Sequence, residues 1–178
     1  MFNDRKIEYH GLTRFRDLSK ITFGPNVKYI DCGAFYNTNI VSLNICYRLR
    51  DVQLPNTLVR VSSCCFANCP LLTSIVIPKS VRIIEYQAFQ NCSKLTDVIF
   101  EEDSQLKTIG PFAFNGCTKL RNINFPKSLT KIEIFAFADC PIENVELHNV
   151  TYIGERAFDN INEDIIDGVM KHGIIENG

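Results

Sequence analysis

The stretch Leu72–Phe89 reads LTSIVIPKSVRIIEYQAF, and its pattern returns along most of the chain. Each copy has two isoleucine-like residues two positions apart, often a proline, then a Val-x-x-Ile pair, and finally a small residue followed by Phe. The phenylalanines that end these copies are Phe35, Phe66, Phe89, Phe114, Phe137 and Phe158. Successive ones lie 21 to 31 residues apart. A period of this length is typical of a solenoid, in which each copy forms one coil.

The positions of the repeat have separate physical roles. Ile75 and Ile77 alternate with period two, which predicts a short strand with both side chains on one face. Pro78 follows directly, and because proline has no N–H it ends the strand and opens a turn. The Val-x-x-Ile pair then supplies apolar side chains from an opposite wall. Phe89 fills the space between the two walls, and the small Ala88 before it indicates that a neighbouring coil passes close by.

A single copy cannot bury this many apolar side chains, whereas stacked copies cover one another and form one continuous core. Strands of successive coils then pair in parallel at about 4.8 Å, so six or seven coils give a sheet roughly 30 Å long. The sequence therefore predicts a β-rich repeat solenoid with short parallel strands and few helices.

The run from Cys69 to Phe89 follows the pattern C-x-x-L-x-x-I-x-I-P, V-x-x-I, A-F. This pattern resembles the BspA-like class of leucine-rich repeats, and the resemblance covers about Leu18 to Asn160. It implies a curved, right-handed coil with a parallel sheet on the concave side. It also implies a role in surface adhesion and protein binding, as in members of this class from bacteria and some protists.

The repeat also predicts the domain organisation, a single leucine-rich-repeat domain over residues 1–178. An N-terminal cap spans 1–17, repeats of about 21–25 residues span 18–160, and a C-terminal cap spans 161–178. Apolar residues near helical spacing in the last segment predict a short amphipathic capping helix. The stretch 36–55 is irregular, with about eight extra residues before Phe66, and reads as either an extra half-coil or a bulged loop. Leu43 and Ile45 look like one strand within it, and Leu49, Val52 and Leu54 look like another.

Composition limits the partners and the location. The formal net charge of −1 and pI near 6.3 give no reason to expect nucleic acid as a partner. No stretch approaches 18 apolar residues, so no membrane insertion is expected. The first residues lack a secretory signal, which predicts a cytoplasmic protein if the chain is complete. A cell-surface location is the alternative if the chain is a fragment that lacks its signal peptide. The oligomeric state stays open.

The chain has eight cysteines, which could form a metal site or disulfide bonds. Four of them, Cys69, Cys92, Cys117 and Cys140, stand three residues after a repeat phenylalanine. Equivalent positions stack in a solenoid, so we expect a buried ladder of thiols that behave as small apolar groups. The cluster C-C-x-x-x-C that begins at Cys64 has no histidine nearby, and we expect no metal site there.

Catalytic motifs are absent from the sequence. The three histidines occupy unrelated settings, and there is no glycine-rich phosphate loop, G-x-S-x-G or H-E-x-x-H pattern. Because the repeat accounts for most residues, we expect no enzyme, no catalytic residues and no cofactor.

The strand phase instead predicts a surface. If Ile75 and Ile77 point inward, Val76 and its counterpart Ile99 point outward and form a small apolar patch with polar edges. Such a patch can mark a contact site, although strand propensity alone also explains these residues. The candidate protein-binding surface consists of Gln53, Val76, Asp97, Ile99, Asn122, Asn124 and Glu146.

The size of this surface limits how it can bind. A sheet of roughly 30 by 13 Å offers about 400 Å², whereas a standard interface buries about 800 Å² on each partner. A partner must therefore also touch the turns or flanks, be a slim peptide, or bind weakly. We expect a non-catalytic protein-binding module for a protein or peptide partner. The alternative is a structural subunit of a larger intracellular assembly.

Overall fold

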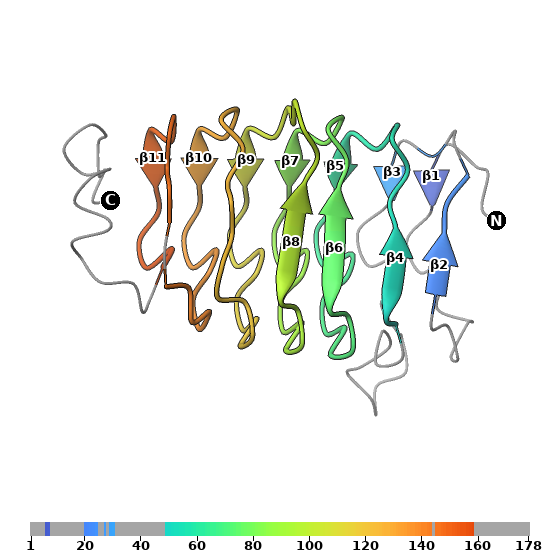
Figure 1. Cartoon of the computed structure of the whole chain (residues 1–178), viewed down its shortest axis with the longest axis horizontal. Coiled ribbons are helices and arrows are strands. Elements are labelled where there is room, and N and C mark those ends of the chain that lie inside the picture. The colour runs from blue at the N-terminus through green and yellow to red at the C-terminus, as the bar shows by residue number, and fades with distance from the viewer. Residues whose placement is uncertain are drawn as a thin grey trace.

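The computed structural model describes residues 6–7, 20–24, 27, 29–30, 49–143 and 145–158. Figure 1 shows their coils stacked side by side in a row, with strands on two opposite walls. The described part of the chain is a parallel β-solenoid that contains no helix, as the repeat predicts. The expected capping helix in 161–178 lies outside these residues.

One wall is built from the alternating strands that the sequence predicts, and we call it the I-x-I wall. Its strands are β2 (Lys20–Thr22), β4 (Asp51–Gln53), β6 (Ser74–Ile77) and β8 (Asp97–Phe100). Within β6, Ile75 and Ile77 are 1% and 0% exposed, whereas Val76 is 44% exposed. The predicted phase of this strand is confirmed. The wall holds two separate parallel pairs, β2 with β4 and β6 with β8.

The longer sheet lies on the opposite wall, which we call the V-x-x-I wall. Its seven strands are β1 (Lys6–Ile7), β3 (Tyr29–Ile30), β5 (Arg60–Val61), β7 (Ile83–Ile84), β9 (Thr108–Ile109), β10 (Lys131–Ile132) and β11 (Tyr152–Ile153). Every neighbouring pair is parallel. The sequence predicted only an apolar contribution from this wall, because two-residue strands are too short to display an alternating pattern.

Strands that precede the irregular stretch 36–55 pair directly with strands at and beyond its end. β2 pairs directly with β4, with Lys20 opposite Asp51, and β3 pairs directly with β5. No further strand separates these pairs on either wall. The strand predicted around Val52 is confirmed, whereas residues 36–48 lie outside the described part of the chain.

The core between the walls is organised around a ladder of buried phenylalanine rings. Rings of neighbouring coils stack nearly parallel, with centroids 5.1–5.4 Å apart, and the ladder consists of Phe66, Phe89, Phe114, Phe137 and Phe158. The small residue before each ring is also buried, as with Ala88 and Ala113. The N–H of Phe89 donates to the carbonyl of Ala113 at 2.7 Å, so the backbones of adjacent coils do approach closely there. None of the described residues lies in a helix able to cross a membrane.

Candidate functional site

The apolar patch predicted on the I-x-I wall is present. Val76 and Ile99 are opposite each other in the parallel pair β6 and β8. Val76 is 44% exposed and Ile99 is 51% exposed. Among the described residues, only Tyr86 is a further large apolar side chain with comparable exposure. Two of the three exposed large apolar side chains therefore lie side by side.

Polar residues surround this patch. The other predicted surface residues, Gln53, Asp97, Asn122, Asn124 and Glu146, are all exposed on the same wall. Asp97 accepts a hydrogen bond from the hydroxyl of Thr96 at 2.6 Å. The structure therefore brings all seven predicted residues to one surface, in the order of the coils.

A groove of about 310 Å³ opens beside Val76, where the I-x-I wall divides between β4 and β6. Its lining includes the side chains of Asp51, Gln53 and Ser74. Asp51 forms an ion pair with Lys20 at 2.7 Å, so its carboxylate already has a cationic partner at this edge. The groove extends the patch toward β4 with polar groups.

A second groove, of about 550 Å³, lies at the turn after β8. Phe100 and Phe125 line it together with the acidic residues Glu101–Asp103. The carboxylate of Glu101 accepts a hydrogen bond from the backbone N–H of Lys79 at 2.9 Å. The acidic turn is thus held against the preceding coil by this contact to its backbone.

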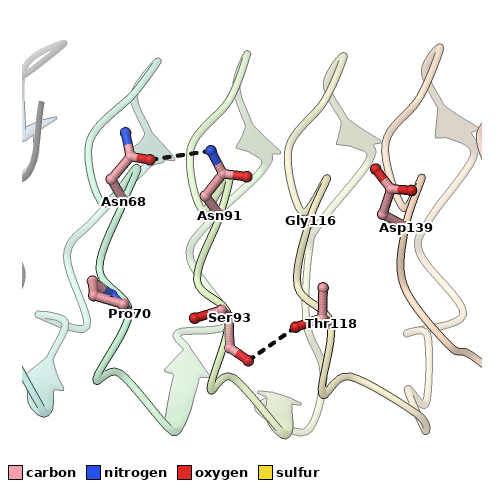
Figure 2. A pocket seen from close by; sticks show the side chains of 7 residues that line it. All are labelled: Asn68, Pro70, Asn91, Ser93, Gly116, Thr118 and Asp139. Atoms are coloured by element: carbon pink, nitrogen blue, oxygen red, sulfur yellow. Dashed lines mark hydrogen bonds between the residues drawn. The ribbon is translucent and has the colours of Figure 1, made fainter.

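A third groove, which we call the flank groove, has a volume of about 540 Å³ and lies on the turns that precede the I-x-I wall. Figure 2 shows its lining side chains, contributed by four successive coils: Asn68, Pro70, Asn91, Ser93, Gly116, Thr118 and Asp139. The side chain of Asn91 donates to that of Asn68 at 3.1 Å, and Thr118 donates to the carbonyl of Ser93 at 3.3 Å.

The flank groove was not predicted from the sequence, although a signal for it exists. The residue before each ladder cysteine is Asn, Asn, Gly and Asp in successive copies. These residue types tolerate the left-handed backbone conformation, so the recurrence is typical of a polar column along a tight turn.

The predicted cysteine ladder is confirmed as a structural feature. The thiols of Cys92, Cys117 and Cys140 are buried, and each donates to the backbone carbonyl of a phenylalanine in the preceding coil at 3.1–3.3 Å. Burial raises the pKa of the Cys117 thiol, and its hydrogen bond with Cys140 adds to this effect. The described residues contain no group of three or more His, Cys, Asp or Glu side chains that could hold a metal ion.

The repeat pattern also matches a known family. The BspA type leucine rich repeat region matches residues 3–51 and 44–163, in six copies. The chain belongs to this family. BspA-type leucine-rich repeats suggest a protein-interaction scaffold, and proteins built from them are generally non-enzymatic and typically bind protein partners.

Solved structures of bacterial leucine-rich repeat proteins share the fold. A leucine rich repeat protein from T. pallidum is 22% identical with a TM-score of 0.67, and the match covers 88% of this chain and 84% of that one. A leucine-rich repeat protein from Eubacterium ventriosum is also 22% identical, with a TM-score of 0.73 over 90% of this chain and 42% of that one.

A leucine rich cell surface protein from Faecalibacterium prausnitzii is 26% identical to this chain. Its TM-score is 0.52, over 80% of this chain and 45% of that one. No curated protein matches the chain significantly.

Proposed function

We propose that this BspA-type repeat chain is a non-catalytic protein-binding module that uses the I-x-I wall and its adjacent turns. The observation that carries the proposal is the paired exposure of Val76 and Ile99 on neighbouring strands. Contiguous exposed apolar side chains with a polar rim are a feature of contact sites in soluble proteins, whereas single exposed apolar residues are ordinary.

The patch fits a partner that offers an apolar side chain flanked by hydrogen-bond donors. Its rim offers acceptors, because Asp97 lies beside it on β8 and the side-chain amides of Asn122 and Asn124 are exposed on the next coil. An extended peptide segment meets this requirement, since alternate side chains point toward the surface and can include both apolar and donor groups.

The small size of the wall supports a partner that also reaches a flank. The wall offers about 400 Å², roughly half of what one side of a standard interface buries. The groove beside β4 and the groove at the acidic turn extend the same face at both ends of the patch. A partner that follows the wall from one groove to the other gains the missing area.

We further propose a role in recognition or adhesion at a cell surface. The similar protein from Faecalibacterium prausnitzii is described as a cell surface protein, which supports this role over a structural role inside an intracellular assembly. A cytoplasmic location of the complete protein remains the alternative.

Site-directed photocrosslinking tests the proposed surface. A benzophenone amino acid is placed at position 99 in one variant and at position 108, on the V-x-x-I wall, in the matched control. The position-99 variant is incubated with intact cells and extracellular matrix from the native environment and irradiated. It should then form discrete covalent adducts with a partner protein. An excess of unmodified protein should compete these adducts away, whereas an excess of Val76→Ser/Ile99→Ser should not. Equal labelling from both walls would contradict the proposal. Recovery of the protein in a complex of fixed stoichiometry inside cells would favour the assembly role.

A further inference from the structure

The flank groove contains a column of four residues with positive backbone φ angles. They are Asn68, Asn91, Gly116 and Asp139, with φ of 58°, 58°, 74° and 60°. Asn and Asp are the side-chain-bearing residues that best tolerate this conformation. Asn68 and Asn91 are joined by an amide hydrogen bond of 3.1 Å, which would continue along the column if residue 116 were also Asn. Glycine interrupts it there.

This interruption leaves an acceptor exposed. A Cβ on residue 116 would lie 2.5 Å from Oδ1 of Asn91, so that oxygen occupies space which a side chain at 116 would need. In Figure 2 it lies on the side of Asn91 that faces Gly116. The Nδ2 group of Asn91 donates to Asn68, whereas within the described residues no donor approaches its Oδ1.

Asp139 provides the second acceptor, on the other side of Gly116. Its side chain is exposed, and its Oδ2 accepts a long hydrogen bond of 3.4 Å from Nδ2 of Asn115, a residue of the Gly116 coil. Lys94 and Lys119 are exposed on the nearby turns. In the described part of the chain neither forms an ion pair with Asp139, so its negative charge is uncompensated.

The amide of Asn68 and the hydroxyl of Ser93 also line the groove, but the side-chain donors that flank Gly116 in its own coil, Asn115 and Thr118, are used within the protein. Nδ2 of Asn115 donates to the carbonyl of Ala138 at 3.1 Å as well as to Asp139. The hydroxyl of Thr118 donates to the carbonyl of Ser93. The centre of the groove therefore presents acceptor oxygens and one negative charge. A ligand that fits must supply several donors and a positive charge.

From these contacts we infer that the flank groove binds the guanidinium group of an arginine side chain from a protein partner. Coils repeat at about 4.8 Å, so Asn91 and Asp139 stand roughly 10 Å apart along the column, on either side of Gly116. A guanidinium carries five N–H donors in a planar fork and can meet acceptors on two sides, whereas an ammonium is a compact point charge. This inference rests on the proposed function, because it assigns one contact to the same kind of partner.

The position of the groove suits that partner. Ser93 and Thr118 each stand two residues before the leucine that begins the next stretch of the I-x-I wall. The flank groove is thus continuous with the wall along the chain. It offers the additional contact area that a partner bound at Val76 and Ile99 requires.

Titration followed by amide NMR tests the site directly. The probe is Nα-acetyl-L-arginine methylamide, and the matched control is the citrulline analogue, which has the same shape but no charge. Saturable shifts of the Gly116 backbone N–H and the Asn91 side-chain amide are expected with the arginine probe, and much smaller shifts with citrulline. The lysine analogue should bind more weakly than arginine.

Two substitutions use residues that the column itself contains, so the fold should tolerate them. Asp139→Asn removes the charge, and Gly116→Asn fills the space that Oδ1 of Asn91 occupies, so the flexible Asn91 side chain must turn away. Each should weaken arginine binding by about tenfold, as expected for the loss of a charge-assisted hydrogen bond. Glu155→Gln is the matched control, because it also removes one exposed carboxylate but lines none of the grooves. It should leave the titration unchanged.

The inference is overturned if arginine and citrulline shift the spectrum equally, if lysine binds as well as arginine, or if Asp139→Asn binds like the unsubstituted protein. An experiment that contradicts the arginine site can be told apart from one that contradicts partner binding at the I-x-I wall. Val76→Ser/Ile99→Ser should fail to compete with the position-99 crosslinker, yet give the same arginine titration as the unsubstituted protein. Crosslinking at position 99 with no response to arginine would leave the proposed function standing and remove only this site.

Discussion

Phe112 and Phe114 are two residues apart in the same turn and stack in the same manner, yet they lie on opposite sides of the coil wall. Phe112 stacks on Phe135 with centroids 5.0 Å apart and planes 12° apart. Phe114 stacks on Phe137 at 5.1 Å and 5°. Phe114 is completely buried, whereas Phe112 is only partly buried. The comparison shows that the spacing of the coils sets the stacking, while burial decides how much each ring stabilises the fold.

The two positions also differ in backbone conformation. Phe112 has a φ of 55°, an unusual value for a bulky residue. The N–H of Phe112 donates to Ile134 at 3.1 Å and that of Phe114 to Ala136 at 2.8 Å, so both groups point toward the next coil. Hydrogen bonds and the outer stack offset the conformational cost of this left-handed residue. Equivalent left-handed residues of successive coils form what we call the outer column: Cys64, Gln87, Phe112, Phe135 and Arg156.

The largest expected effect is at the inner ladder. Phe114→Ala should lower the free energy of unfolding by about 3–5 kcal/mol, because it removes a fully buried ring from between two others. Chemical denaturation followed by circular dichroism measures the change. A loss below that of Phe112→Ala would show that the inner ring is not the one that stabilises the stack.

The second effect separates a thiol of the outer column from one of the core. Cys64 belongs to the outer column and is half-buried, whereas Cys117 is fully buried. Iodoacetamide should modify Cys64 in the native protein. The rate of modification of Cys117 should be lower by a factor on the order of a thousand, because Cys117 reacts only after unfolding. Mass spectrometry of timed samples measures both rates, and equal rates would contradict the buried ladder.

The same buried thiol predicts a pH dependence. Burial raises the pKa of Cys117 above its unfolded value, so its contribution to stability is complete below the ordinary thiol pKa and declines as the pH rises above it. Denaturation from neutral to alkaline pH should show this loss. Cys117→Ala should reduce the slope, whereas an unchanged slope would assign the loss to other groups.

At the outer column, Phe112→Ala should cost about 1 kcal/mol, the value of an aromatic pair with limited burial. Phe112→Gly should be as stable as Phe112→Ala or more so, because glycine adopts the positive φ without strain. If denaturation showed the Phe112→Gly variant to be clearly less stable than the Phe112→Ala variant, backbone strain at this position would be negligible.

The smallest effect is expected at the exposed patch. Ile99→Ser should change the free energy of unfolding by no more than about 0.5 kcal/mol, because the side chain is half exposed. Thermal melts against the unsubstituted protein measure this. A loss similar to that of Phe114→Ala would mean that Ile99 packs into the core.

The sequence predicted correctly those features that depend on the residues of one coil. The alternation of Ile75, Val76 and Ile77 indicated which side chains point inward, because a strand turns successive residues to opposite faces. The recurring cysteine predicted a thiol ladder for a similar reason, since equivalent positions stack. The surface around Val76 and Ile99 could therefore be predicted from the residues alone.

The flank groove and the outer rings were harder to predict because they depend on several coils at once. The significance of Gly116 arises from Asn91 in the coil before it and Asp139 in the coil after it. Likewise, nothing local to Phe112 indicates that its ring stacks on Phe135 outside the core. Both features require the relative position of backbones that are more than twenty residues apart in the chain.

By itself, the sequence determined the solenoid, the inward and outward faces of its alternating strands, and the residues that fill its core. These follow from the periodicity of apolar side chains, which each coil carries within itself. Only the tertiary structure decided that the longest sheet forms on the V-x-x-I wall and that the I-x-I wall divides between β4 and β6. The reason is that backbone hydrogen bonds between coils depend on distance and direction to within a fraction of an ångström, and no single repeat encodes the position of its neighbour.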